Sequence, residues 1–384
     1  MSQPMFDGVP VTGAPAADGK VADAAARVAV TPAADQAAQQ VGEPAVVQSV
    51  AAARGPLALE AVGLDKVFKL GGGQVLHAVR NVSLGLYKGA VVALVGESGS
   101  GKSTVAKLLA GQERPSGGKI MLDGKPIDVH GSHAFRRYKS QVQYVFQDPF
   151  GSLNPVHTAG YHLTRPVKLH QQGNKDVSGT VTALLEQVRL TPPDQFVGKY
   201  PHELSGGQRQ RVSFARALAA QPSVLLADEP VSMLDVSIRL EMLNLLDDLR
   251  TRLSLALLYI THDIASARYF ADEVLVMYGG QIVERGPAED VTQRPSHPYT
   301  QLLIASAPDP DNLGSALKSG NVGNAKKVGN VGPAATGCPF SNRCPLADEK
   351  CKRENPALQL LAPDRAAACW HLEAATSLTA DGAR

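Results

Sequence analysis

The chain has 384 residues, a formal net charge of +2 and a hydrophobic content of 44 %. This length suggests two or three folding units, and the composition is that of a globular protein with a sizeable core. A charge so near to neutral gives no electrostatic reason to expect nucleic acid as a partner. No apolar run approaches the roughly 18–20 residues that span a bilayer, and we see no apolar segment of a secretory signal at the start.

The first segment in chain order, residues 1–56, is rich in Ala, Val, Pro and Gly, and Phe6 is its one aromatic residue. This composition predicts a disordered extension, because it cannot bury enough apolar surface to offset the entropy of folding. The segment is either a solubilising tail or a partner-binding region.

Strand-like and helix-like segments alternate from residue 57 to residue 307. Val91–Val95, Val224–Ala227 and Leu255–Ile260 are continuous apolar runs, as expected for central strands buried on both faces. Between about 149 and 220 the pattern turns helical and polar. The pattern therefore predicts an α/β core with a helical subdomain inserted into it.

The strongest motif lies between the strand at Val91–Val95 and a helical segment that begins near Thr104. It matches G-x-x-x-x-G-K-[ST], in which glycines let backbone N–H groups converge on phosphate oxygens and the following helix presents its positive end. The lysine adds a charge at the β/γ-phosphates, and the last hydroxyl can ligate Mg²⁺. The predicted nucleotide-binding residues are Gly96, Glu97, Ser98, Gly99, Ser100, Gly101, Lys102, Ser103 and Thr104.

A second signal is a pair of carboxylates, Asp228 and Glu229, at the end of the strand at Val224–Ala227. Adjacent side chains at a strand end diverge, so the two can have different roles. Asp228 is placed to hold Mg²⁺, directly or through water, and Glu229 is placed to polarise an attacking water. Taken alone the pair could be a solvated acidic turn, but beside a phosphate loop the catalytic interpretation is favoured.

A second glycine-rich helix start, Leu204-Ser205-Gly206-Gly207-Gln208, indicates the class. Ser205 is a good N-cap, and the glycines expose N–H groups for phosphate. Here the sequence resembles the ABC ATPases, whose signature this pentapeptide is. The resemblance implies a P-loop NTPase fold in which Ser205, Gly206, Gly207 and Gln208 serve the ATP of a partner subunit, so that the active form is a dimer with ATP between the subunits.

The other elements of that family follow in order. Gln147 matches the Q-loop, which touches Mg²⁺ and abuts the transmembrane subunit, and His262 matches the switch histidine that contacts the γ-phosphate. Ser232–Asp235 matches the D-loop, with Met233 where Ala is usual, a departure that we expect to be tolerated. Phe68 stands where the family places the aromatic ring that stacks on adenine, although it could equally be a core residue.

Further stretches resemble the ATP-binding subunits of dipeptide, oligopeptide and nickel importers, above all His297-Pro298-Tyr299-Thr300-Gln301-Leu302-Leu303. The resemblance covers about residues 57–371. It implies an ATP-hydrolysing subunit on the cytoplasmic face of the cell membrane. Its partners would be a second homologous ATPase in a heterodimer, two transmembrane permease subunits and an extracytoplasmic peptide-binding protein. Neither the solute nor the partner chains can be identified from one sequence.

The chain ends in a Gly/Asn-rich linker at 308–336, a cysteine-rich extension at 337–372, expected to be a small unit of its own, and a tail at 373–384. The extension holds every cysteine of the chain: Cys338, Cys344, Cys351 and Cys369. Four thiolates at irregular spacing suit a [4Fe–4S] cluster, which the family resemblance also implies, whereas zinc sites prefer closer pairs. Zn²⁺ is the alternative, and free thiols or disulfides are the third.

There are four alternatives to an ATPase of a peptide importer. A soluble ABC ATPase acting on ribosomes or DNA usually carries two cassettes or long insertions, and a P-loop kinase lacks the signature at 204–208. A degenerate, binding-only subunit is disfavoured by the intact Lys102, Asp228, Glu229 and His262. An importer ATPase for another solute, such as nickel, stays open.

Overall fold

The computed structural model describes residues 55–71, 74–127, 132–171, 173–306, 334 and 336–375. Almost all of the predicted extension at 1–56 and of the predicted linker at 308–336 lies outside the described residues, as does most of the tail at 373–384. The described residues all fall within one compact unit.

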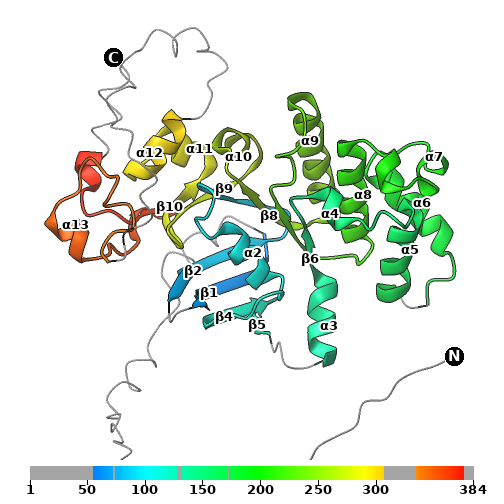
Figure 1. Ribbon diagram of the computed structural model, residues 1–384, viewed down its shortest axis with the longest axis horizontal. Helices are drawn as coiled ribbons and strands as arrows, with labels where there is room; N and C mark the ends of the chain where they lie inside the picture. Colours follow the sequence, from blue (N-terminus) through cyan, green and yellow to red (C-terminus); the bar gives the residue numbers. More distant parts are fainter. Residues whose placement is uncertain are drawn as a thin grey trace, which may run out of the picture. The chain divides into compact units, whose positions relative to one another are not determined.

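Eight of the described strands form one sheet, in the order β11-β12-β10-β9-β3-β8-β7-β6 (Figure 1). Neighbouring strands from β9 to β6 are parallel, whereas β10, β11 and β12 pair antiparallel. The strands are β3 (Val91–Val95), β6 (Val142–Val145), β7 (Val224–Asp228), β8 (Ala256–Thr261), β9 (Glu273–Tyr278), β10 (Gln281–Pro287), β11 (Gln359–Ala362) and β12 (Arg365–Ala367).

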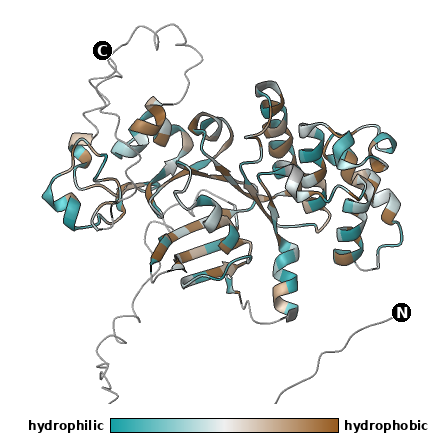
Figure 2. Ribbon diagram, in the orientation of Figure 1, coloured by the Kyte–Doolittle hydropathy of each residue, from teal (hydrophilic) through white to brown (hydrophobic). Residues whose placement is uncertain are grey.

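The central strands of this sheet are apolar because both faces are covered. Successive residues of β3 enter different cores: Val91, Ala93 and Val95 lie in one apolar cluster, and Val92 and Leu94 lie in the other. Figure 2 shows the same strands as brown ribbons running through the middle of the fold. The predicted central strands are therefore confirmed, and the reason is the one expected for a parallel sheet.

A second, antiparallel sheet of four described strands covers the second cluster, in the order β2-β1-β4-β5. Its strands are β1 (Leu57–Lys69), β2 (Val75–Tyr87), β4 (Gly117–Leu122) and β5 (Lys125–Pro126). Leu59 and Leu64 of β1 are fully buried in the cluster, together with Leu108 and Leu109 of α2 (Lys102–Leu109). The helix that follows the phosphate-loop motif is thus held between the two sheets.

Helices occupy the stretch predicted to be helical, and in Figure 1 they gather beyond β6, apart from α2. They pack around apolar side chains such as Leu163, Leu185 and Phe214, which are fully buried. These elements are α4 (Pro149–Ser152), α5 (Ala159–His170), α6 (Val177–Gln187), α7 (Asp194–Val197), the 3-10 helix η3 (Pro201–Glu203) and α8 (Gly206–Leu218). The remaining helices are α3 (Ser132–Gln141), α9 (Val236–Leu253), α10 (Ile264–Phe270), α11 (Ala288–Gln293), α12 (Pro298–Ala305) and α13 (Glu349–Arg353).

The cysteine-rich segment joins the main sheet, which differs from the separate small unit expected from the sequence. Residue Glu284 of β10 pairs with Ala367 of β12, and β11 continues this edge. Phe340, 1 % exposed, belongs to the larger apolar cluster. So short a segment has too few apolar residues for a core of its own, and it therefore uses the core of its neighbour.

In the described part of the chain, no helix combines the length and the apolar character needed to cross a bilayer.

Candidate functional site

The carboxyl ends of the parallel strands meet at one edge of the sheet. Val95 of β3 lies beside Thr261 of β8, and Asp228 of β7 lies beside Ile260. The loop after β3, the acidic pair after β7 and the histidine after β8 are therefore neighbours, although they are far apart in the sequence. Ligand sites of open parallel sheets form at such edges.

The phosphate-binding motif forms a tight loop that ends at Gly101, the N-cap of α2. Gly101 has φ 107°, and a Cβ atom there would collide with the backbone carbonyl oxygen of Ala78. The position therefore requires glycine on both conformational and steric grounds. The loop is also tied to the β9–β10 turn, because Gly280 N donates to Ser100 O over 3.0 Å.

Lys102, the first residue of α2, is only 4 % exposed and points back along the loop. Its Nζ donates to Gly96 O over 2.6 Å and to Glu97 O over 2.9 Å. Burial lowers the pKa of Lys102, and the negative charges of Glu229, Asp228 and Glu97 oppose that shift. The ammonium group is thus held inside the loop and faces the acidic pair.

Asp228 is 4 % exposed and receives two hydroxyl donors. Ser103 Oγ donates to Oδ1 over 3.2 Å, and the Tyr144 hydroxyl donates to Oδ2 over 2.6 Å. Burial, and then Asp228 itself, raises the pKa of Tyr144, so the hydroxyl stays a donor. Sequence reasoning missed Tyr144; its only signal was a tyrosine in the strand that leads to Gln147.

Glu229 follows Asp228 in a left-handed conformation, with φ 44°. Non-glycine residues rarely adopt this region, and such strain is concentrated at functional sites. Gln147 Nε2 donates to Glu229 Oε2 over 2.9 Å, and His262 Nδ1 lies 3.3 Å from Oε1. Three residues singled out from the sequence, each after a different strand, thus meet at one carboxylate.

The oxygen atoms at this edge suit a hard divalent cation. Ser103 offers a hydroxyl, Asp228 a carboxylate and Gln147 an amide oxygen, and Mg²⁺ prefers oxygen ligands of these kinds. The contact between Ser103 and Asp228 shows that two of these groups reach each other without rearrangement of the backbone. The residues present therefore fit Mg²⁺.

The signature segment begins α8, which lies in the helical group and apart from α2 (Figure 1). Ser205 Oγ accepts from Gln208 N over 3.2 Å, and Gln208 Oε1 accepts from Ser205 N over 3.0 Å. This capping box leaves Ser205 exposed, and a Cβ at Gly207 would press on Ile238 of α9. The chain thus has a second glycine-rich helix start, which does not join the phosphate loop of the same chain.

Phe68 lies near the end of β1 and belongs to neither apolar core cluster. Its ring is half-buried, and Lys66 Nζ lies 4.7 Å from the ring centroid. The core alternative is therefore not favoured, and the ring is available for a stacking role.

Two residues of the C-terminal part contact the phosphate loop, and sequence reasoning missed both contacts. The Tyr299 hydroxyl accepts a hydrogen bond from Glu97 N over 2.8 Å. Arg343 donates from Nη1 to Glu97 Oε2 over 2.7 Å and from Nη2 to Oε1 over 2.9 Å. Tyr299 lies in the motif at 297–303, which in the sequence only narrowed the family, and no sequence motif marks Arg343.

All four cysteines are free thiols; Cys338, Cys351 and Cys369 are buried and Cys344 is half-buried. Burial raises the pKa of each thiol, to about 11 for Cys344. The charges of Cys369, Cys338 and Cys351 add to the effect of burial in raising the pKa of Cys344. In addition, ligand atoms of Asp348, Cys351 and His371 lie within 4.8 Å of one another. Soft thiolate donors in this number suit iron–sulfur or zinc chemistry.

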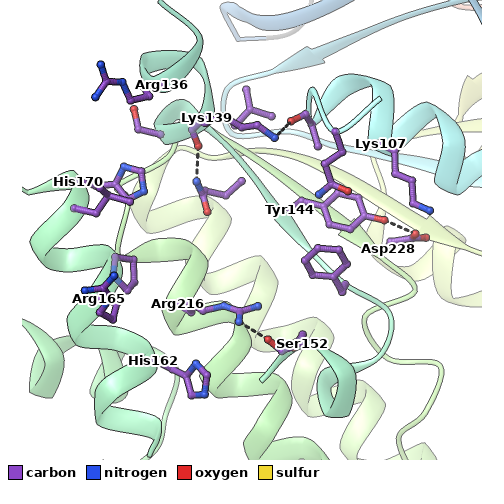
Figure 3. Close-up of a pocket in the computed structure, with 18 of the residues that line it drawn as sticks. Lys107, Arg136, Lys139, Tyr144, Ser152, His162, Arg165, His170, Arg216 and Asp228 are labelled. Carbon is purple, nitrogen blue, oxygen red and sulfur yellow. Dashed lines mark hydrogen bonds between the residues drawn. The ribbon is translucent and has the colours of Figure 1, made fainter. Parts of the chain in front are cut away.

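A cleft of about 1610 Å³ opens beside the acidic pair and is shown in Figure 3. Asp228 and Ser103 lie on its wall together with Gln147. Its other sides come from α3, α5 and α8, and they are basic: Arg136, Arg137, Lys139, Arg165, Lys168 and Arg216. Arg216 Nη1 donates to Ser152 O over 2.6 Å, which fixes this part of the wall.

Comparison with known proteins agrees with these motifs. Residues 79–232 match the ABC transporter family, and residues 283–351 match the oligopeptide/dipeptide transporter C-terminal region. The oligopeptide transport ATP-binding protein OppF of Salmonella typhimurium is 38 % identical over 288 residues, which cover 74 % of this chain and 85 % of OppF. The dipeptide transport ATP-binding protein DppF of Haemophilus influenzae is 36 % identical over 321 residues, which cover 82 % of this chain and 97 % of DppF.

Solved structures of ABC cassettes share the fold. The cassette cbiO1 of Clostridium perfringens has a TM-score of 0.55 and 28 % identity and covers 62 % of this chain and 90 % of its own. The bacterial ABC transporter cassette MJ0796, solved as a dimer, has a TM-score of 0.55 and 27 % identity, with coverage of 60 % and 98 %. The predicted P-loop NTPase fold of an ABC ATPase is thereby confirmed. This chain belongs to the dipeptide/oligopeptide importer family of ABC transporter ATP-binding subunits, and it is an ABC-type ATPase that binds ATP.

Proposed function

We propose that this chain powers the import of di- or oligopeptides by binding and hydrolysing ATP at the edge of its large sheet. The observation that supports this most directly is the meeting of Lys102, Gln147, Glu229 and His262 at that edge. The named relatives are peptide-transport proteins, and the match to their C-terminal region supports the same substrate class.

In the proposed site, the loop N–H groups and Lys102 hold the β/γ-phosphates, and Phe68 stacks on adenine. Ser103, Asp228 and Gln147 would hold Mg²⁺, which neutralises charge on the phosphates. Glu229 polarises the attacking water and takes up its proton. His262 and Gln147 would orient that carboxylate through the contacts at 3.3 and 2.9 Å, and His262 would also contact the γ-phosphate.

The signature at Ser205–Gln208 would complete the site of a partner subunit, since α8 begins away from the loop of its own chain. We propose a heterodimer with a homologous ATPase, two membrane permease subunits and an extracytoplasmic peptide-binding protein. The chain would then lie at the cytoplasmic face of the membrane. Gln147 lines both the catalytic edge and the basic cleft, so a permease docked there could sense the state of the nucleotide.

We propose the division 57–307 for the ATPase domain, with the helical subdomain at about 149–220, and 337–372 for the cysteine-rich extension. The extension would hold a [4Fe–4S] cluster on its four thiols, with zinc as the runner-up. The role of the cluster itself would be structural, because no step of the proposed ATP chemistry uses the four thiols. Iron, sulfide and zinc analysis after anaerobic purification tests this: about four irons and four sulfides support the cluster, and one zinc or neither metal contradicts it.

The catalytic assignment is tested with Glu229→Gln, which keeps the shape of the side chain and removes the base. We expect ATP binding to persist and turnover to fall about a hundredfold or more. Glu186→Gln on α6 is the matched control, because Glu186 is exposed and lies in the helical group. Near-normal hydrolysis by the Glu229 variant in the assembled transporter would contradict the assignment.

Two further measurements address assembly and substrate. The chain alone should bind ATP yet hydrolyse it weakly, since each site borrows a signature from a partner; concentration-independent hydrolysis by a monomer would refute the dimer. In proteoliposomes with both permeases, di- or oligopeptides presented by the binding protein should stimulate ATPase activity. Stimulation of the ATPase activity by nickel and not by peptides would contradict peptide import and support nickel import.

A further inference from the structure

Glu97 is the one acidic residue of the phosphate loop at 96–103, so it brings a negative charge to the loop that would bind the phosphates. A carboxylate beside a triphosphate repels it, and the repulsion acts at close range through a partly buried loop. Glu97 lies directly beside the phosphate-binding lysine, because its backbone oxygen accepts from Lys102 Nζ over 2.9 Å. The loop therefore needs a counter-charge at this carboxylate.

Arg343 supplies that counter-charge from the cysteine-rich segment, 246 residues further along the chain. Both carboxylate oxygens of Glu97 are engaged, at 2.7 and 2.9 Å, in the two-pronged geometry that makes arginine–carboxylate pairs strong. The Arg343 side chain is 20 % exposed and that of Glu97 is 43 % exposed, so solvent screens the pair only in part.

Aromatic rings hold Arg343 in place. Its guanidinium carbon lies 5.7 Å from the Tyr278 ring centroid and 5.6 Å from that of Phe340, distances at which cation–π attraction acts. Phe340 is fully buried, and the Tyr299 hydroxyl that accepts from Glu97 N belongs to the same ring cluster. The backbone and the side chain of Glu97 are thus both bound by the C-terminal part of the chain.

We propose that Arg343 is a positioning residue of the ATP site: it neutralises Glu97 and fixes the phosphate loop, so that the cysteine-rich segment sets the affinity of the chain for ATP. This inference rests on the proposed ATP-binding role of the loop. The cysteine-rich segment would then affect ATP binding, and not only the stability of the fold.

The test is ATP affinity measured by calorimetry on the full chain and three variants. Arg343→Met, which keeps an apolar stem and removes the charge, should bind ATP about three- to tenfold more weakly. Arg343→Lys should recover part of the loss. Glu97→Gln should bind about threefold more tightly, because the free cation then faces the triphosphate, and the double variant Glu97→Gln/Arg343→Met should return to within about twofold of wild type.

Two controls separate charge from folding. Arg353→Ala removes an exposed arginine from α13 of the same segment and should leave ATP affinity unchanged. The deficit of Arg343→Met should shrink as salt is raised, since screening weakens the repulsion from the unpaired carboxylate. Thermal unfolding of each variant reports its folding separately from its affinity.

The possible failures are distinguishable. If the wild-type chain does not bind ATP, the proposed function fails. If it binds ATP but Arg343→Met binds equally well, or if Arg343→Met and Glu97→Gln weaken binding to the same degree, then Arg343 does not act by neutralising Glu97 and the inference is overturned.

Discussion

His297 caps α12, the helix whose Tyr299 contacts the phosphate loop. Protonation of His297 should destabilise the folded protein, and replacement by Asn should remove this pH dependence. The imidazole is 1 % exposed, and its Nδ1 accepts from Tyr299 N over 3.0 Å, which caps α12. The ring also forms a hydrogen bond with the backbone of Ala368. Protonation of Nδ1 would abolish the cap and place a charge in the core, so burial lowers the pKa of His297 to about 3.

The sign and size of the effect follow from that shift. The unfolded histidine titrates near pH 6.5, so between about pH 6.5 and 3 the unfolded state binds a proton that the folded state does not. The free energy of unfolding therefore falls as pH falls below 6.5. Between pH 7.5 and 5.0 the loss from His297 is about 2 kcal/mol, from 1.36 kcal/mol per pKa unit.

Other groups titrate in the same range, so the variant must be compared with wild type. Burial raises the pKa of Glu284, whose carboxylate accepts from His297 N over 2.9 Å, and a raised carboxyl pKa makes stability rise as pH falls. Both proteins contain Glu284, and its contribution largely cancels in the difference. Asn is chosen because it is a strong N-cap residue without a titratable ring.

Urea unfolding at pH 7.5 and at pH 5.0 measures the effect. The free energy lost between the two pH values should be about 2 kcal/mol smaller in His297→Asn than in wild type. His133→Asn, at an exposed site in α3, is the matched control and should behave as wild type does. An equal loss in wild type and in the His297 variant would refute the view that this histidine is neutral because it is buried.

Two more substitutions test the phosphate loop and the acidic pair. Gly101→Ala should lower ATP affinity at least about tenfold, because φ 107° and the collision with Ala78 O both distort the loop; Gly198→Ala, where a Cβ meets nothing within 4 Å, is its calorimetric control. Tyr144→Phe removes a 2.6 Å hydrogen bond to Asp228, so the Mg²⁺ concentration for half-maximal hydrolysis should change about three- to tenfold in the assembled transporter, while the ATP affinity without Mg²⁺ stays the same.

The meeting of the candidate site residues at one edge of the sheet could be predicted from sequence because its parts are local. An apolar strand, a glycine-rich loop and a helix start specify where Lys102 goes, and an apolar strand followed by two carboxylates does the same for Asp228 and Glu229. Parallel strands then bring these ends together without further information. His262, one residue beyond β8, reaches Glu229 for the same reason.

The environment of the edge could not be predicted, because it depends on side chains that meet across long stretches of chain. Nothing near Arg343 marks it as the partner of Glu97, since the contact needs β12 to join β10 and Phe340 to enter the main core. For the same reason the sequence did not indicate that the cysteine-rich segment pairs with β10 of the main sheet. The composition shows that the segment has too few apolar residues for a core of its own. It does not show which part of the chain the segment packs against.

The motif at 297–303, which in the sequence only narrowed the family, has a structural role that connects the phosphate loop with the cysteine-rich segment. Glu284 of β10 accepts from Ser296 N over 2.7 Å and from His297 N over 2.9 Å, which fixes the chain just before α12. His297 then caps α12 through Tyr299 N, and the hydroxyl of Tyr299 accepts from Glu97 N. Each bond positions the next donor or acceptor, so three hydrogen-bonded steps connect the β10 edge with the phosphate loop. Because β12 pairs with that same edge, the cysteine-rich segment is connected to the loop in two ways, by this series of hydrogen bonds and by the direct pair between Arg343 and Glu97.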